Sequence, residues 1–425
     1  MDTCWVNAKE TYDVIVIGGG ASGMMCAGVA AAKGARVLLL EKNRELGRKL
    51  AITGGKRCNI TNNEPDVRKF LSHFPQAGKF LFSPFSKFSS RETFSFFEKR
   101  GLPLVTQARK RVFPKSERAS DVVAVLEKDL RKNDVKILTG TEACALKVDG
   151  DTVTGVTTHQ SETFNARYIV VATGGVAAPE TGSTGDGFRM LRSIGHTVAE
   201  ASPNIVPLKT DAQWVHRLTG TTCSHVEVRF SQGGKVRLKK KGKILFTHFG
   251  ISGPLILNSS FEVRELLAHG AVHASINLFP DLNEAELDAL LVQTFDAHKN
   301  KKLRNVLPEL LPKSVALAVI YLTNPSLGEL SVHSILKENR RKLAKTMRTL
   351  GFPITGTMGF EKAVIADGGV ALEEIDFTTM TSRLFPNLYI LGDMLHVNRP
   401  SGGFSLQLCW TTAWVAAQDI IEKLK

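Results

Sequence analysis

The stretch YDVIVIGGGASG, residues 12–23, places a glycine-rich turn directly after an apolar run. Its glycines have separate tasks: Gly18 permits the tight turn, Gly20 lets the backbone approach a pyrophosphate, and Gly23 allows a helix to pack closely on the strand. We expect that helix over residues 22–33, with its N-terminal amides and its dipole directed at the phosphates. The pattern predicts a dinucleotide-binding turn of the Rossmann type.

A second strand and a terminal acid complete this fingerprint. Residues 37–40 form another apolar run, and Glu41 follows it, 18 residues after Gly23. An acid at this position accepts hydrogen bonds from an adenosine ribose. The complete unit therefore predicts that the N-terminal part of the chain binds a dinucleotide. The expected contacts include three flanking residues: Ala21, Ser22 and Lys42.

The composition is that of a globular protein with an unusual charge. The chain has 425 residues, of which 43% are hydrophobic and 23% are charged, so it is long enough for two or three domains. No apolar run approaches the ~18 residues that span a bilayer, and the first eleven residues lack the apolar segment of a signal peptide. Six scattered cysteines form neither a disulfide framework nor a metal-binding pattern. We therefore expect a cytoplasmic protein that uses no membrane and no metal.

The net charge of +14 is concentrated in the middle of the chain. Between residues 299 and 348, eleven Lys and Arg stand against three Glu. We expect a helix from an N-cap at Ser331 to about Leu350, with apolar residues including Leu336 on its inner side. A basic stripe without neutralising acids would be either a solvated surface or a contact for a phosphate backbone. The residues of this stripe are Lys337, Arg341, Lys345 and Arg348.

A second basic element surrounds Gly233-Gly234, where the alternating pattern predicts a hairpin. No Asp or Glu occurs between Glu227 and Glu262. Two separate basic surfaces favour a nucleic-acid partner, although a charge pattern by itself identifies no ligand. The second strand of this hairpin carries three consecutive lysines: Lys239, Lys240 and Lys241.

The pattern of strands and helices divides the chain into three domains. Residues 1–200 and 356–425 alternate strands with helices, which is typical of a doubly wound parallel sheet and predicts a discontinuous cofactor domain. Residues 201–282 and 350–356 predict a β-barrel-like insert, with short strands at 226–230, 235–238, 243–246 and 271–278. Residues 283–350 predict a basic helical domain nested in that insert. The expected fold class is α/β, a Rossmann-like dinucleotide-binding domain interrupted by both modules.

Two further segments favour FAD as the dinucleotide. The strand that ends at Thr173-Gly174 finishes in small residues, which let its backbone approach a cofactor. Gly392-Asp393 precedes the C-terminal helix, expected from about Ser405, and places Asp393 to accept hydrogen bonds from ribityl hydroxyls. After Gly402-Gly403 the helix N-terminus would face the N1/C2 edge of the flavin and stabilise negative charge on its reduced form. Because no second fingerprint follows, NADPH or NADH is expected as a transient reductant in the flavin pocket.

Beyond these motifs, the chain resembles the BaiN/RdsA-like family of FAD-dependent oxidoreductases over nearly its whole length. The resemblance implies a two-part FAD domain with a β-barrel insertion and a helical domain, in agreement with the pattern of elements. The stretches that carry it are GRKLAITGGKRCNITN (47–62), RVFP (111–114), TGSTGDG (181–187), THFGISGP (247–254), GGV (368–370) and GGFSLQ (402–407).

The chain departs from the family pattern near its C-terminus. The family tends to read Gly-Glu-x-Leu-Asp-Val-Asp-Gly before Gly-Gly-Tyr-Asn, whereas this chain reads GDMLHVNR (392–399) and then GGFS. His396 and Asn398 replace two acids, and Arg399 stands where the family has glycine, as does Lys56 earlier in the chain. These changes predict a more basic mouth of the site.

The resemblance implies two kinds of substrate, a uridine of large-subunit ribosomal RNA that is reduced to dihydrouridine, or a bile-acid intermediate. RNA requires broad cationic surfaces and a steroid requires an apolar cleft, so the charge favours ribosomal RNA or a pre-ribosomal particle. One alternative is an FAD- and NAD(P)H-dependent reductase or oxidase of a small enone, steroid or amine. Another is a non-catalytic flavin-containing protein that binds RNA or senses redox state.

Catalysis on RNA requires that a uracil leave its stack to reach the flavin. Reduced flavin would deliver a hydride to C6, and a protein acid would protonate C5. Cys58 is the candidate acid, because a thiol with a pKa near ~8.5 donates at neutral pH and the cations of Lys56 and Arg57 would lower that pKa. His248 is the second candidate; a buried structural cysteine and a hydrogen-bonded histidine are the alternative interpretations. The remaining expected cofactor contacts are Arg48, Lys49, Asn59, Gly403 and Phe404.

Overall fold

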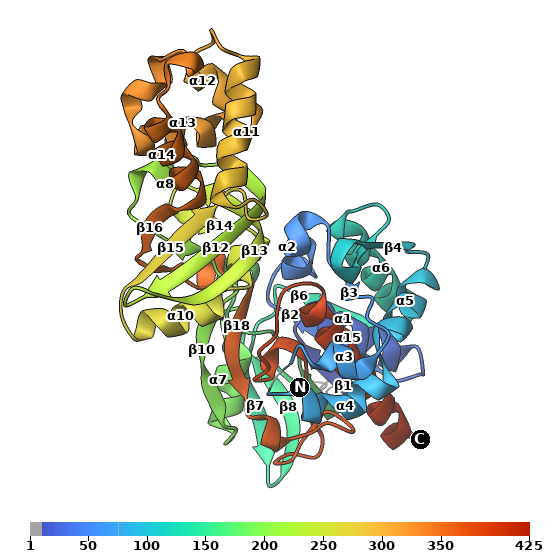
Figure 1. Ribbon diagram of the computed structural model, residues 1–425. Coiled ribbons are helices and arrows are strands. Elements are labelled where there is room, and N and C mark those ends of the chain that lie inside the picture. The colour runs from blue at the N-terminus through green and yellow to red at the C-terminus, as the bar shows by residue number, and fades with distance from the viewer. Residues whose placement is uncertain (1–10, 75) are drawn as a thin grey trace, which may run out of the picture. The chain divides into compact units, whose positions relative to one another are not determined.

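Figure 1 shows the computed structural model of the chain, which describes residues 11–74 and 76–425. Cys4 and nearly all of the segment examined for a signal peptide lie outside these residues. The chain divides into two compact units: a Rossmann unit, with residues up to 203 and from 364 to 425, and an inserted unit of residues 204–363. In the part of the chain that the structure describes, every helix is too short or too polar to span a bilayer.

The Rossmann unit is built on a nine-stranded sheet whose parallel centre holds the dinucleotide fingerprint. β1 pairs in parallel with β2 on one side and with β9 on the other. Residues 14–17 of β1 are buried on both faces, as the continuous apolar run predicts for a covered parallel sheet. The strands are β1 (Thr11–Ile17), β2 (Val37–Glu41), β6 (Lys136–Thr139), β7 (Ala143–Asp149), β8 (Thr152–Thr158), β9 (Thr163–Val171), β19 (Ile375–Asp376), β20 (Thr381–Ser382) and β21 (Leu388–Ile390).

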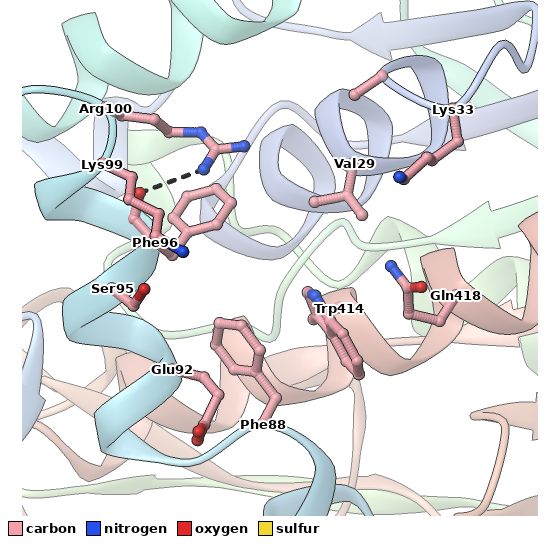
Figure 2. Close-up of a pocket in the computed structure, with 11 residues that line it drawn as sticks. Val29, Lys33, Phe88, Glu92, Ser95, Phe96, Lys99, Arg100, Trp414 and Gln418 are labelled. Carbon is pink, nitrogen blue, oxygen red and sulfur yellow. Dashed lines mark hydrogen bonds between the residues drawn. The ribbon is translucent and has the colours of Figure 1, made fainter.

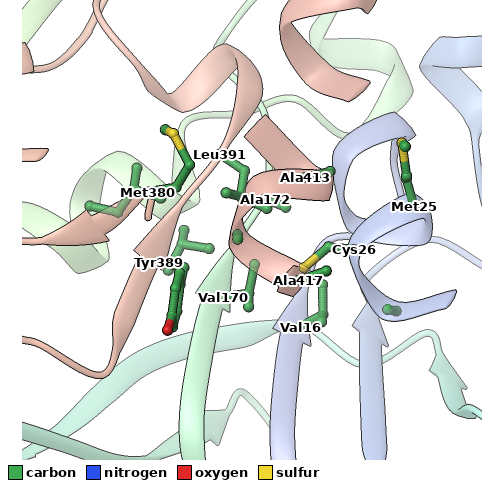
Figure 3. Close-up of a cluster of buried hydrophobic side chains, with 14 of the residues drawn as sticks. Val16, Met25, Cys26, Val170, Ala172, Met380, Tyr389, Leu391, Ala413 and Ala417 are labelled. Atoms are coloured by element: carbon green, nitrogen blue, oxygen red, sulfur yellow. The ribbon is translucent and has the colours of Figure 1, made fainter. Parts of the chain in front are cut away.

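Small side chains let two long helices, α1 (Ala21–Ala31) and α15 (Phe404–Leu424), pack closely on this sheet. Figure 3 shows Cys26 of α1 beside Ala413 and Ala417 of α15, above Val16 and Val170 of the strands. All five side chains are fully buried. The other helices of the unit are α2 (Arg48–Lys56), α3 (Val67–Leu71), α4 (Gly78–Lys87), α5 (Ser90–Glu98), α6 (Ala119–Lys132) and α7 (Asp186–Ser193).

Two small sheets complete the Rossmann unit. One contains β3 (Thr61–Asn62), β4 (Leu104–Gln107) and β5 (Arg111–Pro114), and it brings two of the family-matching stretches together. The other is a ribbon of β10 (Val198–Asn204) and β18 (Ile365–Val370), the strands on which the chain leaves the unit and returns to it. The 3-10 turns η1 (Ala108–Lys110), η7 (Leu372–Glu374) and η8 (Gly392–Met394) lie in its loops.

The inserted unit contains a seven-stranded sheet with the order β16-β15-β12-β13-β14-β11-β17. Its two edge strands, β16 (Leu350–Ile354) and β17 (Gly356–Thr357), are separated by a single residue, so the edges meet and the sheet is barrel-like. The predicted hairpin at Gly233-Gly234 is present, but the two short strands expected after it form one long strand because its ladder is unbroken through the lysines. The other strands are β11 (Leu208–Lys209), β12 (Thr222–Gln232), β13 (Lys235–Thr247), β14 (Gly250–Ser252) and β15 (Val272–Asn277).

The helices of the inserted unit share one hydrophobic core with its sheet, so the two inserted modules form a single unit. The expected helix start at Ser331 is wrong: α14 begins at Lys337, because Ser331 bridges to Lys302 and holds this segment out of the helix. Leu336 is 69% exposed instead of buried. The main helices are α8 (Gln213–His216), α9 (Pro254–Leu257), α10 (Ser260–Ala268), α11 (Glu284–Ala297), α12 (Leu303–Val306), α13 (Lys313–Thr323) and α14 (Lys337–Arg348).

Candidate cofactor and active site

The glycine-rich turn has the shape that a dinucleotide requires. Gly18 adopts a φ of 104°, and its N–H donates to the carbonyl of Leu40 at 2.8 Å. A Cβ on Gly23 would lie 1.8 Å from the carbonyl oxygen of Gly18, so only glycine fits there. A Cβ on Gly20 would meet no atom within 4 Å. Open space at Gly20, next to the N-terminus of α1, is the room that a pyrophosphate needs.

The acid that ends β2 is fixed in place by backbone amides. Oε2 of Glu41 accepts from the N–H of Gly19 at 2.7 Å, and Oε1 accepts from the N–H and side chain of Asn43 at 2.8 and 2.7 Å. Arg48 in turn donates to Oδ1 of Asn43 at 2.9 Å. Glu41 is thereby oriented as an acceptor at the end of its strand, and Arg48 supports the loop that follows it.

Lys42 is held by a carboxylate of the protein. Its ammonium pairs with Asp186 and donates to Oγ1 of Thr184 at 2.5 Å. Burial alone would raise the pKa of Asp186, but Lys42 and Thr184 outweigh it and hold the pKa below its ordinary value. Lys42 thus joins β2 to the TGSTGDG stretch, and its charge is already paired.

The N-terminus of α15 lies beside the N-terminus of α1. A Cβ on Gly392 would lie 2.3 Å from Oγ of Ser22 and 3.1 Å from Sγ of Cys409. The hydroxyl of Ser22 also hydrogen-bonds the thiol of Cys409. Thr173 and Gly174 close the same edge of the sheet, since Oγ1 of Thr173 lies 3.1 Å from Sδ of Met394 in η8. Three of the predicted cofactor segments therefore meet at one place in the Rossmann unit.

The loop before β3 is fastened to α15. Oε1 of Gln407 accepts from the hydroxyls of Thr61 and Thr93 at 2.6 and 2.9 Å, and a Cβ on Gly403 would lie 2.3 Å from the carbonyl of Thr61. Oδ1 of Asn59, in this loop, is buried without a hydrogen-bond partner among the described residues. A buried oxygen of this kind costs free energy unless a further group satisfies it.

Phe404 lies in the core beside this helix start. Its ring centroid is 4.8 Å from that of Phe70 and 4.5 Å from that of His73, and the side chain is 5% exposed. Phe404 therefore offers a cofactor its backbone, at the first position of α15, rather than its ring.

Asp393 forms the centre of a charged group with Lys49 and Arg399. Nζ of Lys49 lies 3.5 Å from Asp393, and the guanidinium of Arg399 binds Asp393 and the hydroxyl of Ser405. Burial would raise the pKa of Asp393, but Arg399 and Lys49 hold it below its ordinary value, so the group carries one net positive charge. Arg399 is 3% exposed. The prediction that Arg399 makes the mouth of the site more basic is therefore wrong, because its charge is buried and paired.

These features together fit an FAD. The N-terminus of α1 would hold the pyrophosphate, Glu41 the adenosine ribose, and Asp393 the ribityl chain. The orphaned oxygen of Asn59 and the open space at Gly20 are the two observations that indicate a missing group. Gln407 was not among the predicted site residues, although it ends the family-matching stretch at 402–407; its two acceptor bonds position the Asn59 loop.

Cys58 lies inside this loop, with an exposed fraction of 0%. Burial raises the pKa of its thiol to about 12, and a hydrogen bond with Thr53 offsets only part of this effect. The prediction that Lys56 and Arg57 lower this pKa is wrong. Lys56 is exposed, and the guanidinium of Arg57 turns to Glu117, 3.5 Å away. The thiol is therefore protonated at neutral pH.

His248 belongs to the inserted unit, in the turn between β13 and β14. Its ring is exposed and lies edge-on to Phe249, with 4.9 Å between the centroids. Gly250 and Gly253 beside it have positive φ and sit against neighbouring backbone, which fixes the turn. His248 is thus an accessible group on a rigid turn.

The lysines of the hairpin are matched by carboxylates. Lys239 lies 3.1 Å from Glu227, Lys240 lies 3.4 Å from Glu262, and Lys241 lies 2.8 Å from Asp281. The sequence gap in acids between residues 227 and 262 is therefore misleading, because the fold brings its two end residues and Asp281 to the lysines.

The basic stripe of α14 also faces an acid, contrary to expectation. Asp288 of α11 binds Arg340 at 2.8 Å, and its pKa is lowered first by that contact and further by the nearby charges of Arg341 and Lys337. Arg348 is used within the fold, since it donates to the carbonyl of Leu282. Lys345 has no carboxylate partner among the described residues.

A separate cleft of about 330 Å³ opens at the C-terminal half of α1 (Figure 2). The rings of Phe88 and Trp414 stack in it with 5.4 Å between centroids, and Arg100 lies over the ring of Phe96 at 3.6 Å. It lies at the other end of α1 from Gly18, so it is distinct from the cofactor site. In the described part of the chain, no group of three His, Cys, Asp or Glu is placed to hold a metal ion.

The comparisons with known proteins agree with this geometry. The chain matches the HI0933-like protein Rossmann domain over residues 12–419. The ribosomal RNA dihydrouridine synthase of Escherichia coli (strain K12) is 29% identical over 97% of this chain and 98% of its own length. The 3-dehydro-bile acid delta(4,6)-reductase of Clostridium scindens is 30% identical over 96% of this chain and 98% of its own.

Solved structures show the same fold. The 3-ketosteroid delta1-dehydrogenase of Sterolibacterium denitrificans has a TM-score of 0.55 at 14% identity, and the alignment covers 97% of this chain and 100% of that one. A flavocytochrome c3 fumarate reductase has a TM-score of 0.54 at 16% identity, covering 97% and 78%. The predicted α/β fold and the prediction of an FAD-dependent oxidoreductase are confirmed. The chain belongs to the HI0933-like Rossmann family.

Proposed function

We propose that the chain uses FAD to reduce a uridine of large-subunit ribosomal RNA to dihydrouridine, in the cytoplasm, on the RNA or a pre-ribosomal particle. The observation that carries this proposal is the charge of the inserted unit, in which 22 Lys and Arg stand against 13 Asp and Glu. Such an excess suits a polyanionic substrate, whereas a neutral enone or steroid has no need of it. The name of the Escherichia coli relative supports the same reaction.

When bound, FAD supplies the hydride and is itself reduced by NADPH or NADH. The residues of the chain bind it and adapt its surroundings to that task. The group formed by Lys49, Asp393 and Arg399 adds one positive charge near the N-terminus of α15, and both stabilise negative charge on a reduced cofactor.

We propose that Sγ of Cys58 donates the proton to C5 of the uracil, with His248 as the second candidate donor. Burial raises the pKa of this thiol to about 12, which makes it a weaker acid than the sequence predicts, but the thiol keeps at neutral pH the proton that C5 requires. Because Sγ is buried, the loop of residues 54–59 has to move for the transfer.

Mass spectrometry of nucleosides from large-subunit ribosomal RNA tests the proposal. The RNA of a strain that lacks this protein is compared with that of its parent. We expect one dihydrouridine to be replaced by uridine, and the intact gene to restore it. Identical RNA in both strains would exclude the ribosomal substrate.

The Clostridium scindens relative, which is 30% identical, supports a second candidate function, the reduction of a small enone or steroid. The two candidates differ in their dependence on charge. The concentration of a neutral enone that half-saturates the protein should not change with salt, whereas the affinity for RNA should fall steeply as the salt concentration rises. Oxidation of the reduced flavin by an enone, with unchanged ribosomal RNA, would favour the second candidate.

A further inference from the structure

Two loops of the Rossmann unit bring three guanidiniums together, those of Arg57, Arg109 and Arg111, here called the arginine cluster. The pairing of β3 with β5 joins the loops, and the N–H of Asn63 donates to the carbonyl of Lys110 at 2.7 Å. The Cζ atoms of Arg57 and Arg111 lie 4.5 and 5.9 Å from the centroid of one ring, that of the buried Phe113. Arg57 and Arg111, from separate loops, thus lie near the same aromatic ring.

The cluster carries more positive charge than its surroundings balance. Glu117 lies 3.5 Å from Arg57 and also accepts from Gln107, and Glu64 pairs with the neighbouring Lys110 at 2.5 Å. Among the described residues, no carboxylate pairs with Arg109 or Arg111, and Nε of Arg111 is satisfied only by the carbonyl of Ala108 at 3.2 Å. Lys56 adds a further exposed cation to the same loop.

The charges of Arg57 and Arg109 act on the guanidinium of Arg111 in this arrangement. The pKa of Arg111 is lowered, first by partial burial and then by the charges of Arg57 and Arg109. Three like charges with one carboxylate, Glu117, to balance them indicate a place for an anion. An arginine side chain is well suited to this role, because its planar donors bind a phosphate at two points.

The backbone at the cluster is strained. Of the ten described residues other than glycine with positive φ, five lie in these loops, with φ between 52° and 67°. Strain of this kind is retained where a site requires a particular geometry. The five residues are Lys56, Cys58, Arg109, Lys110 and Glu117.

The same loops reach the cofactor site. Nδ2 of Asn62 donates both to the carbonyl of Arg109 and to the carbonyl of Gly402, each at 3.2 Å, and Gly402 lies just before α15. The unsatisfied oxygen of Asn59 lies two residues after Arg57. An anion on the cluster would therefore lie beside whatever reaches the cofactor.

We propose that the arginine cluster is a binding site for a phosphate ester of the molecule that reacts at the cofactor. Two sources carry this group, the phosphodiester of a single-stranded RNA and the 2′-phosphate of NADPH. Only the RNA source depends on the proposed function. The site itself is inferred from the three guanidiniums of the arginine cluster.

The test uses the FAD-loaded protein and the variant Arg109→Gln, whose side chain is exposed and has no structural partner in the described residues. Arg57→Gln is the second variant, and Arg131→Gln is the matched control, because the side chain of Arg131 is 75% exposed and pairs, among the described residues, only with Glu127 of its own helix. One probe is a fluorescein-labelled uridine-rich single-stranded RNA, followed by anisotropy at several salt concentrations. The other is NADPH, compared with NADH in stopped-flow reduction of the flavin.

We expect Arg109→Gln and Arg57→Gln to lower the affinity for one of the two probes by about tenfold, while Arg131→Gln binds both probes as the parent protein does. Weaker RNA binding with a salt slope smaller by about 0.7 per variant identifies the phosphodiester as the source. Slower reduction of the flavin by NADPH, with unchanged reduction by NADH, identifies the 2′-phosphate as the source. Normal binding of both probes to folded, FAD-loaded variants would overturn the site.

The failure of this site and the failure of the proposed function give different results. If the ribosomal RNA of the deletion strain keeps its dihydrouridine while Arg109→Gln still weakens NADPH, the function fails and the phosphate site stands. If the deletion strain loses the dihydrouridine and the arginine variants bind both probes as the parent protein does, the function stands and the site fails.

Discussion

Nδ1 of His196 lies 2.7 Å from Oε2 of Glu374, and Nε2 of the same buried ring lies 3.0 Å from Oγ of Ser382. The order of these groups is that of a hydrolytic triad. Oγ of Ser382, however, accepts from the N–H groups of Leu384 and Phe385, both at 3.0 Å, and the serine is 3% exposed. The three residues therefore fasten η7, β20 and the segment after α7 to one another, and they form no nucleophilic site.

Glu374→Gln should make the stability of the protein less dependent on acid pH. Burial raises the pKa of Glu374, but hydrogen bonds from Thr197 and His196 outweigh it and hold the pKa below its ordinary value. A carboxylate of this kind stabilises the fold above its unfolded pKa of about 4.3, and the contribution is lost as pH falls through the lower folded pKa. At neutral pH the variant should lose about 1–2 kcal/mol. Melting curves should converge with those of the parent in acid, and a constant difference at every pH would contradict the assignment.

Substitutions at two glycines of the fingerprint should separate cofactor binding from folding. Gly20→Ala adds a methyl group to open space, so the apoprotein should melt normally while FAD binds at least tenfold more weakly. Gly23→Ala drives a methyl group to 1.8 Å from the carbonyl of Gly18, so both melting temperature and FAD affinity should fall. Thermal melts of the apoprotein and fluorescence titration with FAD measure the two effects. Equal behaviour of the two variants would argue against a cofactor at Gly20.

Cys58→Ala should abolish product formation without releasing FAD. Loss of a proton donor lowers the rate by about 10²–10⁴-fold. The Cys58→Ser variant should turn over more slowly than the parent protein. Retained flavin absorbance and an unchanged melting temperature serve as controls for folding. Turnover at the parental rate would remove Cys58 from the mechanism and leave His248 to be tested.

Alkylation should distinguish the described thiols in the folded protein. Iodoacetamide at mildly alkaline pH should label Cys144, which is exposed, and leave Cys58 unlabelled, because burial raises its pKa to about 12. Peptide mass spectrometry after a brief reaction makes the comparison. Rapid labelling of Cys58 would show that its loop opens readily in solution.

The two basic surfaces of the inserted unit should contribute unequally to RNA binding. Replacement of Lys337, Arg341 and Lys345 by glutamine should weaken a single-stranded RNA probe more than replacement of Lys239, Lys240 and Lys241, because each of the latter lysines is paired with a carboxylate. Both variants lose three charges, so each is the control for the other. Equal losses would indicate that net charge alone attracts the RNA.

The sequence predicts the fingerprint, the two-part domain and the hairpin, because each is specified by local chemistry. An apolar run, a glycine turn and a terminal acid dictate β1, α1 and β2 with little help from the rest of the chain. The start of α14 differs from the prediction because a bridge from Ser331 to the distant Lys302 overrides a good local cap signal.

The electrostatics of the site could not be predicted from spacing. Arg399 follows Asp393 by six residues in a loop, and only the folded chain shows that it turns inward and neutralises that acid. The lysines of β13 likewise find partners 12 to 40 residues away. Charge counted along a sequence therefore overstates the charge that the surface presents.

The ribbon of β10 and β18 gives the inserted unit the character of a cassette. The chain enters and leaves that unit on two adjacent strands, so its two attachment points are neighbours. An evolutionary exchange of everything beyond this ribbon would leave the fingerprint, Asp393 and the start of α15 intact, since all of them lie in the other unit. One flavin-binding platform can in this way keep its fingerprint while the unit attached to it diverges, so cofactor binding and substrate preference can evolve separately.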